Sequence, residues 1–168
     1  MRLLLIEGAP YSGKSTVAQF FSELGASVVD ADHLARIAIE RGSEGFDDVV
    51  ARFGEKILTN GDINRKALAE IVFSDPAAKR DLEGIIHPRV QKLFAQAIID
   101  NEPAPHLIYE IPLLVETDAA SKFDFIVTVE ADEDLRIERL LTRGMFITDI
   151  KARLASQAPS QARIDIAD

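Results

Sequence analysis

An eight-residue motif near the start of the chain constrains its fold more than any other feature. The segment Gly8–Ser15 (GAPYSGKS) fits G-x-x-x-x-G-K-[ST] and directly follows the apolar run Leu3–Ile6. Such a loop needs a buried strand before it and a helix after it, because its backbone N–H groups must converge on phosphate oxygens. The helix is predicted by apolar residues that recur at helical spacing after the loop: Val17, Phe20, Phe21 and Leu24.

The motif gives each part of this loop a role in binding a nucleoside triphosphate. The loop amides and the positive end of the helix hold the α- and β-phosphates, and Lys14 reaches the β- and γ-phosphates. The Ser15 hydroxyl ligates Mg²⁺. A chance Gly-Lys-Ser turn is the alternative, and the strand and helix patterns on either side argue against it.

Length, composition and charge indicate one globular domain. The chain has 168 residues, of which 47% are hydrophobic and 28% charged, so it can bury a core of ordinary size. Its net charge of −9 argues against a nucleic-acid partner, because phosphate neutralisation needs a basic face. The absence of cysteine excludes disulfides and thiolate metal sites.

The hydropathy pattern argues against a membrane partner. No segment approaches the roughly 20 apolar residues of a membrane span. The apolar stretch after Met1 and Arg2 is too short for a signal peptide. We therefore expect a cytoplasmic location.

Four apolar segments predict buried strands of an α/β fold with a mostly parallel central sheet. They are Leu3–Glu7, Ser27–Asp30, His106–Ile111 and Asp124–Glu130. In open α/β sheets, ligands bind at the edge formed by the carboxyl ends of the strands. The first three segments carry polar groups there: the phosphate loop, Asp30 with Asp32, and Glu110.

The stretch between the second and third predicted strands, 42–105, has helical periodicity. Pro88 lies inside its clearest apolar stripe and should kink or break the helix. That stripe consists of Leu82, Ile86, Val90, Leu93, Phe94 and Ala97. Asn60-Gly61-Asp62 predicts a turn. We interpret the stretch as a helical insertion over the ligand edge; the alternative is a crossover that only covers the sheet.

A basic helix face is predicted after the fourth strand. The segment Asp132–Arg143 has acidic residues in its first turn, which suits the helix dipole. Gly144 ends this pattern, and a second helix is predicted to run to about Gln157. Three arginines share one face of the first helix: Arg136, Arg139 and Arg143. They could stabilise the charge of the transition state. The alternative is a solvated helix face on which they pair with Asp132 and Glu138.

Carboxylates at the strand ends are the candidates for proton transfer and metal binding. Phosphoryl transfer needs a group that accepts the nucleophile's proton, and Asp32 is our candidate for this general base. Alternatively, Asp30 or Asp32 caps the following helix. Glu110 ends another strand, where it could hold Mg²⁺ through water.

Other sequence features separate the classes of P-loop protein. Asp81–Gly84 matches D-x-x-G but no strand precedes it, and the chain lacks N-K-x-D and L-S-G-G-Q motifs, which argues against GTPases and transport ATPases. A small-molecule kinase remains. His87, next to Pro88 in an apolar context, is by itself more typical of a structural residue.

Together these features resemble the dephospho-CoA kinase family. The matching motifs hold their order and spacing from residue 1 to 168. They are Gly13–Ala18, Val29–Asp32 with Leu34-Ala35-Arg36, Val72–Pro76, Ile86-His87-Pro88, Ile111–Leu114 with Glu116, and Arg139 and Arg143 before a stretch ending at Gln157. The Asp-Ala-Asp, His-Pro and Pro-Leu-Leu elements distinguish this family from adenylate-type and sugar kinases.

The resemblance implies a three-layer P-loop kinase fold, with a core at about 1–41 and 104–138, a substrate-binding insertion at about 42–103 and a lid at about 139–158. It implies that MgATP binds the loop and that the ribose 3′-hydroxyl of dephospho-CoA attacks the γ-phosphate, with Asp32, Lys14 and Arg139 as catalytic residues. The implied ATP contacts are Gly8, Tyr11, Ser12, Gly13, Lys14, Ser15, Thr16 and Arg143. The implied substrate contacts are Asp30, Asp32, Arg36, His87, Leu113 and Glu116.

The chain also departs from the family pattern. The family loop is usually G-G-I-G-S-G-K-S, and here its second to fourth positions are Ala9, Pro10 and Tyr11. Glu110 stands in place of the usual Asp, and Gly144 in place of a common acidic residue. The sequence stops at Asp168, where family members continue with one more edge strand and a C-terminal helix, so we expect both to be missing. Two alternatives therefore stay open: another small-molecule P-loop kinase, or a nucleotide-binding relative that has lost catalysis.

Overall fold

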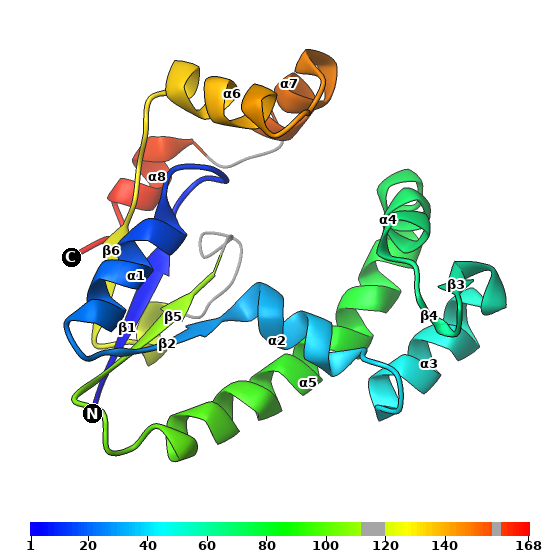
Figure 1. The fold of residues 1–168 in the computed structure, drawn as a ribbon, viewed down its shortest axis with the longest axis horizontal. Coiled ribbons are helices and arrows are strands. Elements are labelled where there is room, and N and C mark those ends of the chain that lie inside the picture. Colours follow the sequence, from blue (N-terminus) through cyan, green and yellow to red (C-terminus); the bar gives the residue numbers. More distant parts are fainter. Residues whose placement is uncertain (112–119, 156–158) are drawn as a thin grey trace. The chain divides into compact units, whose positions relative to one another are not determined.

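The computed structural model describes residues 1–111, 120–155 and 159–168. The contacts within the chain divide it into two compact units. The first unit combines Met1–Asp30 with Asn101–Asp168, and the second is Ala31–Asp100. Figure 1 shows the order of the elements along the chain. The division into a core, an insertion and a lid stays a prediction.

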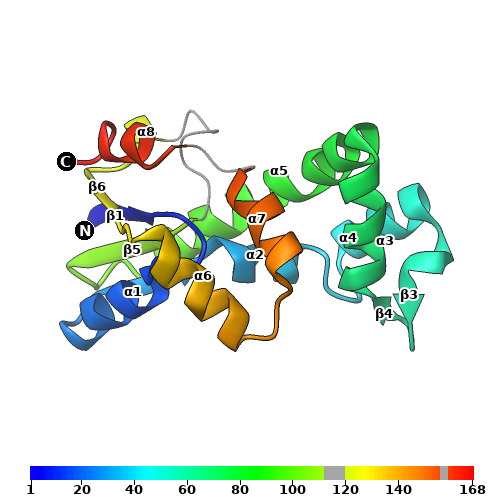
Figure 2. The ribbon, with the colours of Figure 1, turned by 90° about the horizontal axis from the view of Figure 1, so that it is seen from above.

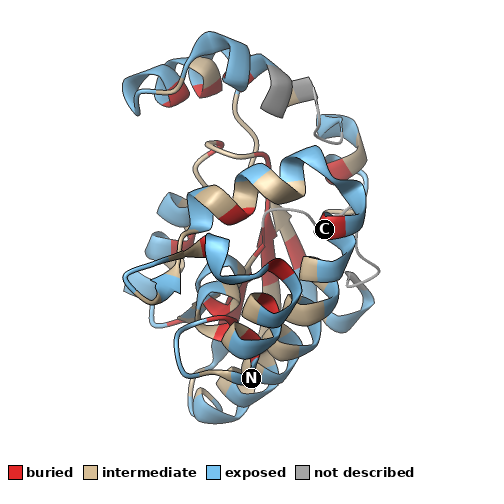
Figure 3. Cartoon of the chain, turned by 90° about the vertical axis from the view of Figure 1, so that its right-hand side faces the viewer, coloured by how far each residue is buried: buried red, intermediate tan, exposed pale blue. Residues whose placement is uncertain are grey.

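The first unit contains a four-stranded sheet in the order β2-β5-β1-β6, with every neighbouring pair parallel. The strands are β1 (Arg2–Glu7), β2 (Ser27–Asp30), β5 (His106–Glu110) and β6 (Phe125–Thr128). The predicted strands and the α/β class are thus confirmed, with small differences at the strand ends. Figure 3 shows buried positions along the central strands in red. The fully buried apolar side chains of the sheet include Leu5, Ile6, Leu107 and Ile108.

The register of the sheet brings the carboxyl ends of the strands level with one another. Glu110 pairs with Ile6 on one side and with Asp30 on the other. Glu7 pairs with Thr128. Of the polar residues expected at this edge, Asp30 and Glu110 are therefore neighbours in the sheet, whereas Asp32 lies in the following helix.

Helix α1 (Lys14–Glu23) packs against β2 and β5 on one face of the sheet (Figure 2). Ala18 is buried in it, and Val17 and Phe21 pack beside Ala18. The face predicted from the sequence is wrong in part, because Phe20 is 57% and Leu24 84% exposed. Ala18 packs in the core, and Phe20, two residues later, therefore lies on a different face of the helix and is exposed.

Among the described residues after β6, the first unit has the helices α6 (Glu133–Thr142), α7 (Ile147–Ala155) and α8 (Ser160–Ile164). A short 3₁₀ turn, Ala120–Lys122, precedes β6. The predicted break at Gly144 is confirmed, since this residue has a φ of 82° between α6 and α7. The expected end of the second helix near Gln157 lies outside the described residues. After α8, the Asp168 N–H donates to the Ile126 carbonyl oxygen, 3.0 Å away, on β6.

The second unit is mainly helical. Its elements are α2 (Ala31–Ala38), α3 (Glu44–Phe53), a 3₁₀ turn (Glu55–Ile57), β3 (Leu58–Thr59), β4 (Asp62–Ile63), α4 (Arg65–Ser74) and α5 (Pro76–Asp100). Its core includes Val49, Phe53, Ile57 and Leu68. The predicted turn joins β3 to β4, with positive φ at Asn60 (55°) and Gly61 (84°), as the tight turns that join such short strands require.

The sequence predicted that Pro88 would kink or break its helix; helix α5 runs unbroken through Pro88, so the helix does not end there. Pro88 removes one hydrogen bond and crowds the carbonyl of Gly84, whose backbone adjusts more readily than that of other residues. Packing holds the helix on both sides: Ile85 and Ile86 contact the core, and Arg89 pairs with Asp48 of α3. None of the helices in the described ranges is long and apolar enough to cross a membrane.

Candidate active site

The loop between β1 and α1 begins at a glycine that has no room for a side chain. Gly8 has a φ of 151°, and a Cβ added to it would lie 2.2 Å from the carbonyl oxygen of Val129. The Val129 N–H in turn donates to the Glu7 carbonyl oxygen at 2.9 Å. The first glycine of the motif is therefore required by the close approach of the chain that follows β6.

The loop ends at the N-terminus of α1, and the first turn of this helix contains no acidic residue. Gly13 is the N-cap residue, with a φ of 111° and no side chain that could cap the helix. The N-terminus of a helix carries partial positive charge and N–H groups without partners inside the helix, and both features favour the binding of an anion. Thr16 begins the hydrogen-bond ladder, donating its N–H to the Gly13 carbonyl oxygen at 3.0 Å.

Lys14 lies back across the loop. Its Nζ donates to the carbonyl oxygens of Gly8 at 2.9 Å and of Ala9 at 3.2 Å. The ammonium group thus donates to neutral carbonyl acceptors of the loop. A phosphate is a stronger, charged acceptor for the same donors.

Ser15 is joined to Glu110 across the sheet edge. The Ser15 Oγ donates to Glu110 Oε1 at 2.8 Å, so the two residues that the sequence assigned to Mg²⁺ lie together. Both offer hard oxygen ligands, which Mg²⁺ prefers. The described residues contain no cluster of three or more side chains able to hold a metal by themselves. The chemistry of this pair therefore fits an ion that takes its other ligands from phosphate and water.

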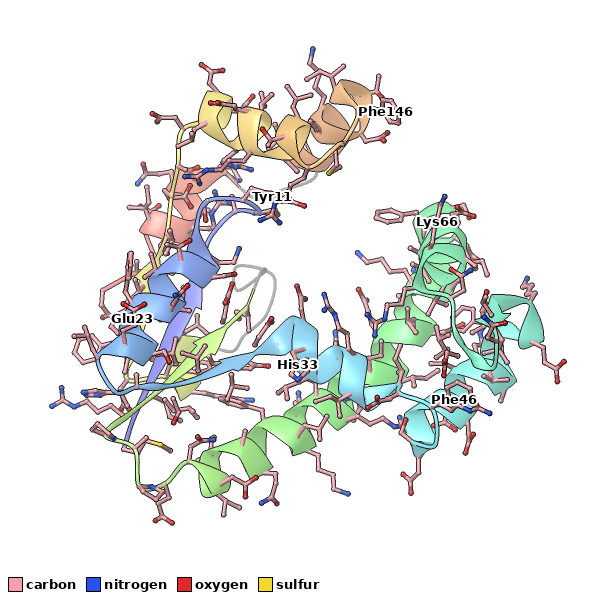
Figure 4. All side chains as sticks on the ribbon, viewed as in Figure 1. Tyr11, Glu23, His33, Phe46, Lys66 and Phe146 are labelled. Carbon is pink, nitrogen blue, oxygen red and sulfur yellow. The ribbon has the colours of Figure 1, made fainter. Side chains whose placement is uncertain are left out.

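The predicted arginine face of α6 lies against the loop. Arg139 Nη1 donates to the carbonyl oxygens of Tyr11 at 2.8 Å and of Ser12 at 3.1 Å. Arg136 Nε donates to the Pro10 carbonyl oxygen at 3.3 Å. The predicted basic face thus lies over the middle of the loop, Pro10–Ser12, and is not turned away from it. Figure 4 labels Tyr11 on the loop next to α6.

A buried charge cluster beneath this loop was not predicted from the sequence. Arg163 of α8 donates to Glu130 from Nε at 2.6 Å and from Nη2 at 3.0 Å, and its side chain is only 6% exposed. Ser160 also donates to Glu130, at 2.8 Å. The wholly buried Glu7 accepts a hydrogen bond of 3.0 Å from Thr128. In the sequence, the only sign of this cluster was that the first and fourth predicted strands end in Glu7 and Glu130. No sequence pattern marked the distant Arg163 as their neighbour.

The charges of this cluster alter one another's protonation. Burial by itself raises the pKa of Glu130, but the hydrogen bonds from Arg163 and Ser160 and the charges of Arg163 and Arg136 outweigh burial and lower this pKa. The hydrogen bond to Glu130 raises the pKa of Arg163 in return. Burial, and after it repulsion from Arg163, lowers the pKa of the Arg136 guanidinium.

The other predicted site residues are divided between the two units. Asp30 ends β2 beside Glu110 in the first unit. Asp32 lies in the first turn and Arg36 in the last turn of α2, and both are exposed. His87 lies exposed on α5, the helix against which α2 packs. Leu113 and Glu116 lie outside the described residues.

The comparison with known proteins decides the family. The family model described as dephospho-CoA kinase matches residues 3–168. The chain belongs to the dephospho-CoA kinase family. A dephospho-CoA kinase from Gamma-proteobacterium EBAC31A08 is 39% identical over 165 residues, which are 97% of this chain and 83% of that protein. One from Mycobacterium leprae is 41% identical over 97% of this chain, which spans only 40% of the longer mycobacterial protein.

Solved structures of relatives have the same fold. A crystal structure from Thermus thermophilus has a TM-score of 0.87 and 32% identity, and the match covers 99% of this chain and 85% of that one. Dephospho-CoA kinase from Campylobacter jejuni has a TM-score of 0.69 and 26% identity over the same shares. Shikimate kinase from Acinetobacter baumannii, at 12% identity and a TM-score of 0.55, shares the fold alone.

Proposed function

We propose that the chain transfers the γ-phosphoryl group of ATP to the ribose 3′-hydroxyl of dephospho-CoA and releases coenzyme A and ADP. The observation that carries this proposal is the phosphate loop, with Lys14 and Ser15, in a chain that matches one kinase family over nearly its whole length. A basic helix face against the loop supports the same chemistry, because phosphoryl transfer depends on positioning and charge neutralisation.

The loop and α6 supply the groups that hold the triphosphate. Lys14 exchanges the carbonyl oxygens of Gly8 and Ala9 for phosphate oxygens when the nucleotide binds. Arg139 already lies at the loop and stabilises the charge on the transferred group. The remaining ATP contacts are Gly8, Tyr11, Ser12, Gly13, Ser15, Thr16 and Arg143.

Ser15 and Glu110 hold Mg²⁺ in this proposal. The Ser15 hydroxyl would ligate the ion directly, and Glu110, which accepts the hydrogen bond of this hydroxyl, would contact the ion through water. When bound, Mg²⁺ neutralises the phosphate oxygens and orients the triphosphate.

Asp32 takes the proton of the attacking hydroxyl. It follows Asp30, which ends β2 at the ligand edge, by two residues. The chain therefore keeps the Cα atoms of Asp32 and Asp30 within about 7 Å of each other. The remaining substrate contacts in this proposal are Asp30, Arg36, His87, Leu113 and Glu116. A small charged substrate of this kind is consistent with a cytoplasmic enzyme.

The acceptor is tested by measuring ADP release with ATP, Mg²⁺ and each of four acceptors: dephospho-CoA, adenosine, AMP and gluconate. We expect turnover with dephospho-CoA alone, and a product that carries its new phosphate on the 3′-oxygen by ³¹P NMR. Turnover with another acceptor would make the chain a different P-loop kinase. ATP binding without turnover would make it a relative that has lost catalysis.

The role of Asp32 is tested by Asp32→Asn. The amide cannot accept the proton, so we expect kcat to fall by about 10²–10⁴-fold. The dissociation constant for ATP should stay within about 2-fold, because the variant keeps the whole phosphate loop. Asp62→Asn, on the exposed hairpin of the same unit, is the matched control and should retain kcat. A normal kcat in Asp32→Asn would remove Asp32 from the role of base.

A further inference from the structure

Tyr11 adopts a backbone conformation that its side chain does not favour. Its φ is 65°, in the left-handed region, where a bulky residue is uncommon and costs free energy. Such a residue persists when its surroundings determine its conformation, and strain of this kind is often found at functional sites. The contacts of Tyr11 therefore indicate what holds it.

Both ends of Tyr11 are held by arginines of the same helix. Arg139 donates to its carbonyl oxygen at 2.8 Å, and the guanidinium carbon of Arg143 lies 5.1 Å from the centre of its ring. Arginines four residues apart share one face of a helix, so a single orientation of α6 makes both contacts. The distance of 5.1 Å is within the range of a cation–π interaction.

The contact matters because Arg143 is otherwise poorly restrained. It is the C-cap residue of α6 and is exposed, and a long side chain in such a position samples many rotamers. The aromatic face limits the guanidinium to one place beside the phosphate loop. A positive charge that is already in position binds a polyphosphate more tightly, because less conformational entropy is lost on binding.

We propose that Tyr11 is a positioning residue, whose ring holds the Arg143 guanidinium beside the phosphate loop for a bound nucleoside triphosphate. This inference rests on the proposed function of the loop. As a loop residue Tyr11 contacts ATP through its backbone amide, whereas its side chain acts through Arg143, so the effect of the side chain on nucleotide affinity disappears when Arg143 is absent.

The test is a double-mutant cycle on the dissociation constant for ATP with Mg²⁺, measured by calorimetry. We expect Tyr11→Ala to weaken binding by about 2–5-fold, the size of an exposed cation–π interaction. Arg143→Ala should weaken binding further, and the double variant should bind as Arg143→Ala does. Arg52→Ala is the matched control, because Arg52 also lies over an aromatic ring, that of Phe53, but in the second unit.

Conservative variants separate the effect of the aromatic ring of Tyr11 from the effect of its side-chain volume. Tyr11→Phe keeps the aromatic face and should restore the affinity lost in Tyr11→Ala, whereas Tyr11→Leu keeps only apolar volume and should not. All three variants keep a side chain at the positive φ, so the backbone strain is comparable, and thermal unfolding checks that each variant is folded.

Three results would overturn the proposal. Additive effects in the double variant would mean that Tyr11 acts independently of Arg143, and wild-type affinity in Tyr11→Leu would mean that volume alone suffices. Absence of ATP binding in the wild type would overturn this proposal and the proposed function together. A coupled cycle in a protein that does not phosphorylate dephospho-CoA would support the role of Tyr11 and reject only the proposed acceptor.

Discussion

At the scale of single residues, Gly8 is a position where one added methyl group should cost free energy of folding. Gly8→Ala places a Cβ 2.2 Å from the carbonyl oxygen of Val129, at a φ of 151° that an L-residue rarely adopts. We expect this variant to lose about 2–4 kcal/mol of unfolding free energy, measured by urea denaturation.

Gly25→Ala is the control for this prediction. Gly25 also has a positive φ, 93°, but nothing lies within 4 Å of its added Cβ. It should therefore lose only about 1 kcal/mol, the cost of the backbone conformation. Equal losses in the two variants would show that the contact with Val129 has no energetic weight.

Glu110 is the second residue with a specific expected effect. In Glu110→Gln the partner of the Ser15 hydroxyl loses its charge. Removal of such a partner of a metal ligand costs about 10–100-fold in metal affinity, so the Mg²⁺ concentration for half-maximal turnover should rise by that factor. Glu23→Gln, on the exposed end of α1, is the control. An unchanged Mg²⁺ dependence would separate Glu110 from the metal.

At the scale of elements, the Glu130–Arg163 pair joins α8 to the chain that follows β6, and this link should depend on pH. Its hydrogen bonds and the neighbouring positive charges outweigh burial and lower the pKa of Glu130 below its usual 4.5. The folded state therefore binds fewer protons than the unfolded state between the two pKa values. The stabilisation is complete above about pH 5 and is lost as the pH falls through the lowered pKa.

Glu130→Gln tests this dependence. We expect it to lose about 1–3 kcal/mol of unfolding free energy at pH 7, because the buried Arg163 loses its charged partner. The difference from the wild type, measured by urea denaturation at each pH, should shrink as the pH falls below about 5 and through the lowered pKa of Glu130. Glu138→Gln, which removes an exposed carboxylate of α6, is the control. A difference that stays constant with pH would contradict the linkage.

The elements also separate what the sequence could predict from what it could not. The phosphate loop and the strands were predictable, because their signals are local: glycines at fixed spacing and short apolar runs. The meeting of Ser15 and Glu110 followed from one topological rule, that parallel strands end at the same edge.

Features that depend on tertiary packing were not predictable in this way. The face of α1 was wrong in part because Ala18, rather than the larger Phe20, packs toward the sheet. Pro88 stays inside a continuous helix because the packing around α5 outweighs the lost hydrogen bond. The partner of Glu130 lies 33 residues away in the chain, and no local pattern marks Arg163 as that partner.

At the scale of the whole molecule, the two compact units have separate cores. One core cluster includes Ile6, Ala18 and Ile108, and the other includes Val49, Phe53 and Leu68. The phosphate loop belongs to the first unit alone. A ligand that binds only the folded protein stabilises first the structure that forms its site.

ATP should therefore stabilise the two units unequally. At 100 times its dissociation constant, a ligand adds about 2.7 kcal/mol, which corresponds to a rise in melting temperature of roughly 5–11 °C for a chain of this size. In hydrogen exchange, ATP should slow the amides of β1 and α1 more than those of α3 and α4. Lys14→Ala is the control and should lose both effects, because it removes the loop's cation. Equal slowing in both units would contradict this prediction, since it would mean that the two cores open as one cooperative structure.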